Sequence, residues 1–140
     1  MATSAKAIGD IVMRVLVGIL FVCIGIQGIG DFGGNALYSA IDNEVANIIL
    51  GIVILLAGIL LVATIFLSGI KKSFTTASML IVLAVWVVVI VFADFVEGLS
   101  GVKGNEWFTW AETFIYHLLI LASIAKVAMP AMKKVAKAAK

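Results

Sequence analysis

The sequence predicts an all-α, polytopic membrane protein built as a bundle of four transmembrane helices. Hydrophobic residues make up 64% of the chain and charged residues only 13%, whereas soluble domains are about half apolar and a quarter charged. The apolar residues gather in long runs, each near the ~20 residues that a helix needs to cross the bilayer core. Lipid offers the backbone no hydrogen-bond partner, and these runs do not alternate in polarity as barrel strands do, so we expect helices.

The predicted spans are residues 11–29, 45–67, 77–96 and 108–129. Little of the 140-residue chain remains outside them, so we expect a single transmembrane domain over residues 1–140. Gly-rich segments after the first and third spans predict tight turns.

Three short segments complete the predicted organisation. Lys71 and Lys72 separate the second span from the third. Pro130 is expected to end or kink the fourth helix. Residues 130–140 then form a basic tail.

The charges predict an orientation in the membrane. Every basic residue except Lys103 falls on one side of the predicted spans, and cytoplasmic loops are enriched in Lys and Arg. We therefore expect a multi-pass protein of the inner (cytoplasmic) membrane with both termini in the cytoplasm. Every acidic residue except Asp10 falls on the outer side, Asp31 and Asp42 included. Two interpretations stay open for that acidic side: solubility of the outer loops, or a mouth that attracts cations or protons.

Glycines in the first two spans predict a helix contact. Gly18 and Gly25 lie on one face of the first span, and Gly51 and Gly58 on one face of the second. In lipid, small residues let two backbones approach and gain dispersion contacts. We expect these faces to pack, within the chain or between copies in a homo-oligomer.

Polar residues inside the spans are functional candidates, because they are costly in lipid. Thr109, Glu112, Tyr116 and Ser123 form a stripe on the fourth helix, which we expect to face the bundle interior. His117 lies beside the stripe, roughly 15 Å below Trp107. The candidate interior polar cluster is Gln27, Asp94, Glu112, Tyr116 and His117. It is interpreted either as a functional site or as a hydrogen-bonded network that fixes the helix register.

Specific enzyme chemistries find little support. The chain has one His and one Cys, so it cannot supply two His ligands to a haem or form an internal disulfide, and no metal-binding or phosphate-loop motif is present. We expect no metal site, and the residues identify neither a catalytic group nor a cofactor, so a role other than that of an enzyme is favoured. A proton or quinone site that uses His117 and Glu112 stays open, because an imidazole exchanges a proton near neutral pH.

Two segments resemble the DoxX-like membrane proteins. The first is RVLVGILFVCIGIQGIGDF, beginning at Arg14, with a Gly four residues later and further glycines toward its end. The second is NIILGIVILLAGILL, which carries Gly51 and Gly58 but has Asn47 where that family often has Glu. The resemblance implies a four-helix bundle. It also implies a role like that of family members that are subunits of quinone-linked thiosulfate oxidation or partners in thiol-redox complexes.

The expected function is therefore a subunit or partner of a larger inner-membrane complex, quinone- or redox-linked. The alternative is a small transporter or channel for a cation, proton or small solute, which would use the acidic outer mouth and the polar face of the fourth helix. A subunit requires a filled core and a contact face at lipid level, whereas a transporter requires a wet path past His117. The expected partners are the bilayer and other membrane subunits or copies of the chain, and not nucleic acid.

Overall fold

The computed structural model describes residues 2–30, 35–41 and 43–140; Asp31 and Asp42 lie outside them. Their helices are α1 (Ala2–Gly30), α2 (Ala36–Ser39), α3 (Glu44–Phe66), α4 (Lys72–Ile90), the π-helical segment η1 (Val91–Glu97) and α5 (Glu106–Ala138). Four helices are long and apolar enough to cross a membrane: α1, α3, α4 with η1, and α5. The prediction of an all-α chain with four such helices is confirmed.

Short polar side chains start the helices near the first loop. The side chain of Asn43 accepts a hydrogen bond from the backbone N–H of Ala46 at 3.0 Å, and that of Asn35 accepts one from Leu37 at 3.0 Å. Each satisfies a backbone donor that the first turn of a helix leaves without a partner. These caps place α2 and the start of α3 where the sequence changes from polar to apolar.

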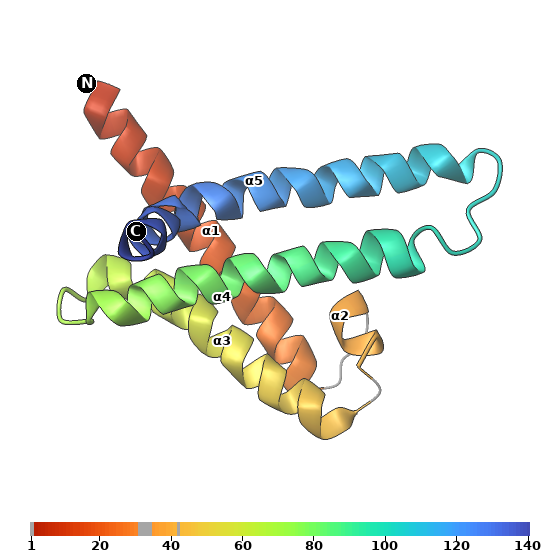
Figure 1. Cartoon of the computed structure of the whole chain (residues 1–140), viewed down its shortest axis with the longest axis horizontal. Helices are drawn as coiled ribbons and strands as arrows, with labels where there is room; N and C mark the ends of the chain where they lie inside the picture. The colour runs from red at the N-terminus through yellow and green to blue at the C-terminus, as the bar shows by residue number, and fades with distance from the viewer. Residues whose placement is uncertain (1, 31–34, 42) are drawn as a thin grey trace.

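The helices form two antiparallel pairs, α1 with α3 and α4 with α5. Figure 1 shows the pairs meeting near the turn between α3 and α4 and diverging away from it, with α2 between their far ends. We call these far ends, where α1 finishes, α3 begins, η1 finishes and α5 begins, the acidic end. The opposite end, which holds Lys71, Lys72 and Lys126, is the basic end.

Glycines bring α1 and α3 into backbone contact. A Cβ added to Gly25 would lie 2.6 Å from the backbone N of Leu55, and one added to Gly58 would lie 2.7 Å from the carbonyl oxygen of Gly18. Gly51 faces the backbone of α1 in the same way, 2.8 Å from the oxygen of Gly25. The absence of side chains at these positions is what allows this pair to pack closely.

Large side chains fill the region where the pairs meet. Phe21, Ile54, Leu61 and Ile124 are each 0% exposed. Trp86 is 4% exposed, and its ring centroid lies 6.2 Å from that of Phe21. This apolar core ties the two pairs together on the basic side of the polar site described below.

Polar contacts add further links between and within the pairs. At the basic end, Lys126 of α5 pairs with Asp10 of α1 at 3.2 Å, which links the two pairs. Arg14 of α1 donates a hydrogen bond to the hydroxyl of Thr64 of α3, which strengthens the first pair. At the acidic end, the hydroxyl of Ser39 donates to Glu97 at 2.6 Å, which connects α2 to η1.

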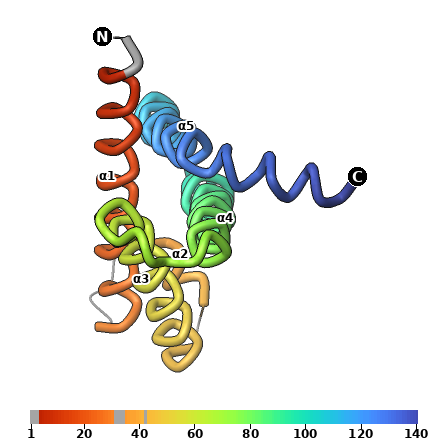
Figure 2. Tube along the Cα trace, turned by 90° about the vertical axis from the view of Figure 1, so that its left-hand side faces the viewer, coloured from red at the N-terminus to blue at the C-terminus, as the bar shows by residue number. Residues whose placement is uncertain are grey.

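Pro130 kinks α5 but does not end it. The helix contains Pro130 and continues to Ala138. Figure 2 shows the terminal part of α5 turning away from the bundle toward the C-terminus. A proline inside a helix removes one backbone donor and crowds the preceding turn, which accounts for the bend.

Candidate functional site

The main polar site is an ion-pair-like contact between Asp94 of η1 and His117 of α5. His117 Nδ1 lies 2.8 Å from both carboxylate oxygens of Asp94. The Asp94 residue is 1% exposed, and the His117 side chain is 21% exposed. The site therefore joins a buried carboxylate to an imidazole that keeps one open side.

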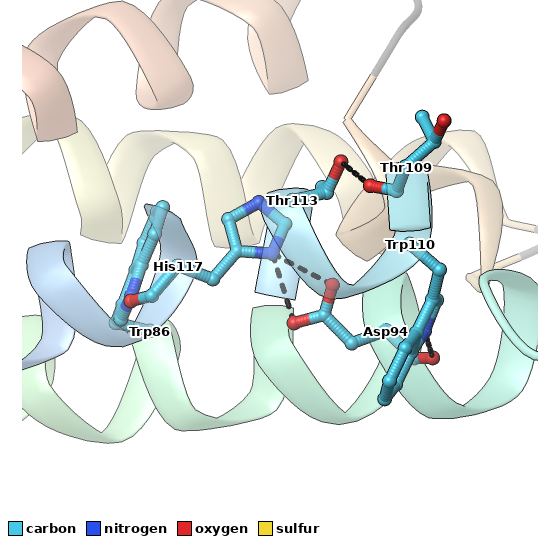
Figure 3. A network of polar contacts seen from close by, with 6 residues as sticks. All are labelled: Trp86, Asp94, Thr109, Trp110, Thr113 and His117. Carbon is cyan, nitrogen blue, oxygen red and sulfur yellow. Dashed lines mark hydrogen bonds and ion pairs between the residues drawn. The ribbon is translucent and has the colours of Figure 1, made fainter. Parts of the chain in front are cut away.

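Two tryptophans hold the backbone on either side of this pair. Trp110 Nε1 donates to the carbonyl oxygen of Asp94 at 2.8 Å, and Trp86 Nε1 donates to that of His117 at 3.1 Å. The Trp86 ring meets the His117 ring edge-on, with centroids 5.7 Å apart. Figure 3 shows the two indoles flanking the pair, one on each side along the helices.

The π-helical segment sets the position of Asp94. A π-helix bonds i to i+5 and is wider than an α-helix, and such turns are frequent at functional sites. Asp94 is the buried residue of η1. In this segment the carbonyl of Asp94 accepts the bond from Trp110 while its side chain points at His117.

An open hollow lies beside Asp94 at the acidic end. It measures about 350 Å³ and is lined by the loop between η1 and α5 and by the first turns of α5. Its polar lining comes from Asp94, Ser100, Glu106, Thr109 and Thr113. Trp110 contributes an aromatic wall. The hollow therefore borders Asp94, whereas His117 is not part of its lining.

The pair joins a carboxyl group and an imidazole through a shared hydrogen bond. An ionised Asp94 accepts a hydrogen bond from Nδ1–H of the imidazole, which leaves Nε2 as the second ring nitrogen. Figure 3 shows this second nitrogen pointing away from Asp94. A proton added at Nε2 would turn the hydrogen bond into an ion pair between imidazolium and carboxylate.

The structure does not bring the other three predicted cluster residues to this pair. Gln27 is half-buried on α1, and among the described residues no hydrogen bond joins it to Asp94 or His117. Glu112 and Tyr116 are exposed and bond to each other, with the Tyr116 hydroxyl donating to Glu112 at 2.7 Å. Four of the five predicted residues therefore form two separate pairs, Asp94 with His117 inside the bundle and Glu112 with Tyr116 on its surface, and Gln27 belongs to neither.

The expectation that the polar stripe of α5 faces the interior is wrong. The buried residues of α5 are Ile124, Ala128 and Ala131, whereas Tyr116 is 55% exposed. Both lipid and bundle interior are apolar, so an apolar face can belong to either. The inward face of α5 is the apolar one that carries Ile124, Ala128 and Ala131.

A second hollow, of about 330 Å³, lies at the acidic end between α1, α2 and α3. Tyr38 lines it and donates from its hydroxyl to the carbonyl oxygen of Ile24 at 2.9 Å. Burial raises the pKa of Tyr38 to about 12, because the phenolate would lose its hydration. Asn47 donates to the carbonyl oxygens of Tyr38 and Ile41 and so fixes the loop over this hollow.

Metal coordination has no support in the part of the chain that the structure describes, where no three His, Cys, Asp or Glu side chains converge. Comparisons with protein-family models, with curated proteins and with solved structures find no match for the chain. The resemblance to the DoxX-like proteins therefore stays a prediction.

Proposed function

We propose that the protein is a small subunit or partner of a larger membrane complex, to which it contributes the Asp94–His117 pair as a protonatable site. In this proposal the chain spans the inner membrane four times, with the basic end and both termini in the cytoplasm and the acidic end outside. The distribution of Lys and Arg supports the orientation. The resemblance of the first two spans to DoxX-like proteins favours a redox-linked complex.

The exposed pair of Glu112 and Tyr116 carries the proposal. By the rise of a helix, Glu112 lies about 8 Å below Trp107, and Tyr116 lies one turn deeper. A carboxyl and a phenol at this depth are costly against acyl chains. A helix of another subunit packed on this face would remove them from lipid and offer further hydrogen bonds.

The filled interior also favours a subunit. Trp86 packs against His117 on one side and near Phe21 on the other, and Ile124 and Ala128 continue the buried core along α5 toward the basic end. The two hollows described above both lie at the acidic end. A proton taken up at His117 from that end therefore meets packed apolar side chains toward the basic end.

A transporter or channel is the second candidate, and the hollow beside Asp94 is the observation that favours it. An acidic, open hollow that leads to a buried Asp–His pair fits a site for a proton or small cation that enters from outside. Transport would require the core at Trp86 to open, which a subunit does not require. The two candidates therefore differ in what purified protein alone can do.

Site-specific photo-crosslinking in native membranes distinguishes them. A photoreactive amino acid at position 116 should crosslink to a membrane protein, whereas one at Ile59 should not. Ile59 is the matched control for position 116, because both side chains are similarly exposed, Tyr116 at 55% and Ile59 at 45%, but they lie on different spanning helices. Crosslinking of position 116 to lipid alone would refute the subunit proposal. Proton or cation flux in liposomes that contain only this chain would then support the second candidate.

A further inference from the structure

The terminal part of α5 has a direction that differs from all four spanning helices. In Figure 1 those helices lie roughly in the plane of the picture, whereas the last turns of α5 point along the line of sight. In Figure 2, after a quarter turn, the same segment runs sideways to the C-terminus. If the four helices span the membrane, a segment that runs roughly perpendicular to all of them lies along the membrane surface. We call residues 131–140 the tail segment.

Apolar and basic residues occupy opposite sides of the tail segment. Met132, Val135 and Ala139 follow one another at helical spacing, and Met132 and Val135 are 45% and 49% exposed. Four lysines occupy the other side and its border: Lys133, Lys134, Lys137 and Lys140. A helix with an apolar face and a Lys-rich face is the type that lies in the interface of a bilayer.

The root of the tail segment is fixed to the bundle. Ala131 is 3% exposed and belongs to the apolar core. Lys126, one turn before Pro130, is held by Asp10 of α1. Within the described residues, the ion pairs are those of Lys126 with Asp10 and His117 with Asp94, so the four tail lysines are left without a carboxylate.

We propose that the tail segment binds the anionic phospholipid headgroups of the cytoplasmic leaflet, with Met132 and Val135 inserted at the level of the first acyl carbons. Charge complementarity selects this ligand, because four cations and no acidic residue lie in residues 131–140. The proposal depends on the cytoplasmic placement of the basic end and not on the subunit role. Each Lys near an anionic surface contributes ~1 kcal/mol, a factor of about five in the ratio of bound to free tail.

The test measures the depth of the tail in the full chain. Cys23 is replaced by Ser, and Val135→Cys carries an environment-sensitive fluorophore. The protein is placed in nanodiscs of phosphatidylcholine alone or mixed with phosphatidylglycerol, with a quencher attached to the lipid. Ser73→Cys, in the first turn of α4, is the matched control, because it lies at the basic end but outside the tail.

The label at position 135 should be quenched in the anionic nanodiscs and released in neutral ones, with no such change at position 73. Each Lys→Gln substitution should lower the bound-to-free ratio about fivefold, and added salt should lower it further. Equal quenching in neutral and anionic nanodiscs would overturn the proposal, as would a label that stays in water in both. The comparison of lipids needs no substitution of lysine, so it decides the question even if a Lys variant does not fold. If the crosslinking experiment refuted the subunit proposal, the expected quenching results would stay the same.

Discussion

Replacement of Gly25 by Ala should separate α1 from α3 and destabilise the bundle. The added Cβ would lie 2.6 Å from the backbone N of Leu55 and 2.7 Å from its Cα, whereas ordinary contact begins at 3.4 Å. The obstacle is backbone and cannot rotate away, so the two helices must move apart by roughly 0.8 Å at this point. Strain of this kind costs about 1–3 kcal/mol.

The measurement needs a control for helix propensity, because Ala is favoured over Gly in a helix by about 1 kcal/mol. Gly9→Ala supplies it, since Gly9 is in the same helix and a Cβ there meets nothing within 4 Å. Unfolding of both variants in mixed micelles, followed by helix content during titration with sodium dodecyl sulfate, gives the difference directly. We expect Gly25→Ala to be about 1–3 kcal/mol less stable than Gly9→Ala. Equal stability of the two variants would refute the close contact.

Three further predictions concern the site, the first loop and the orientation. Asp94→Ala should lower the free energy of unfolding by about 3–5 kcal/mol, because it leaves His117 without its partner. Asp94→Asn should lower it less, because the amide oxygen can still accept a hydrogen bond. Equal losses for the two variants in chemical unfolding would contradict the pairing. The pKa of Tyr38 is raised to about 12 in the folded protein, so its neutral form contributes stability below pH ~10 that is lost as the pH rises toward ~12. The difference in phenolate absorbance between wild type and Tyr38→Phe should therefore have its midpoint near pH 12. A midpoint near pH ~10 would show a solvated phenol instead. With Cys23 removed, an impermeant thiol reagent applied outside intact cells should label Ser100→Cys and not Ser73→Cys, and the reverse pattern would invert the orientation.

The sequence predicted the long helices well because lipid-length apolar runs leave the backbone few alternatives. Their ends were less accurate, since α1 extends back to Ala2 and α5 forward to Ala138. Each extension contains three Ala residues, a type that favours helix, among polar or charged residues that interrupt an apolar run. A hydropathy pattern therefore does not show that the helix continues beyond the apolar run.

The site was only partly predictable, for two physical reasons. Asp94 and His117 were both expected inside the bundle, but their direct contact depends on the π-helical turn of η1, which no residue pattern in Val91–Glu97 announces. The prediction that Glu112 faces the bundle interior was wrong, because that interior is as apolar as the lipid and does not attract a polar stripe. A polar stripe then indicates only that something other than lipid lies against it, which another subunit satisfies as well as the bundle does.

The π-helical segment makes chain length itself a determinant of the site. A π turn accommodates one more residue than the α turn it replaces, so the direction of Asp94 depends on how many residues lie between Ile90 and Gly98 as well as on which they are. Deletion of a single residue there would let the helix return to α geometry and rotate Asp94 away from His117, although neither partner had been substituted. Related chains that keep the pair are therefore expected to tolerate exchanges of apolar residues in this stretch more readily than insertions or deletions.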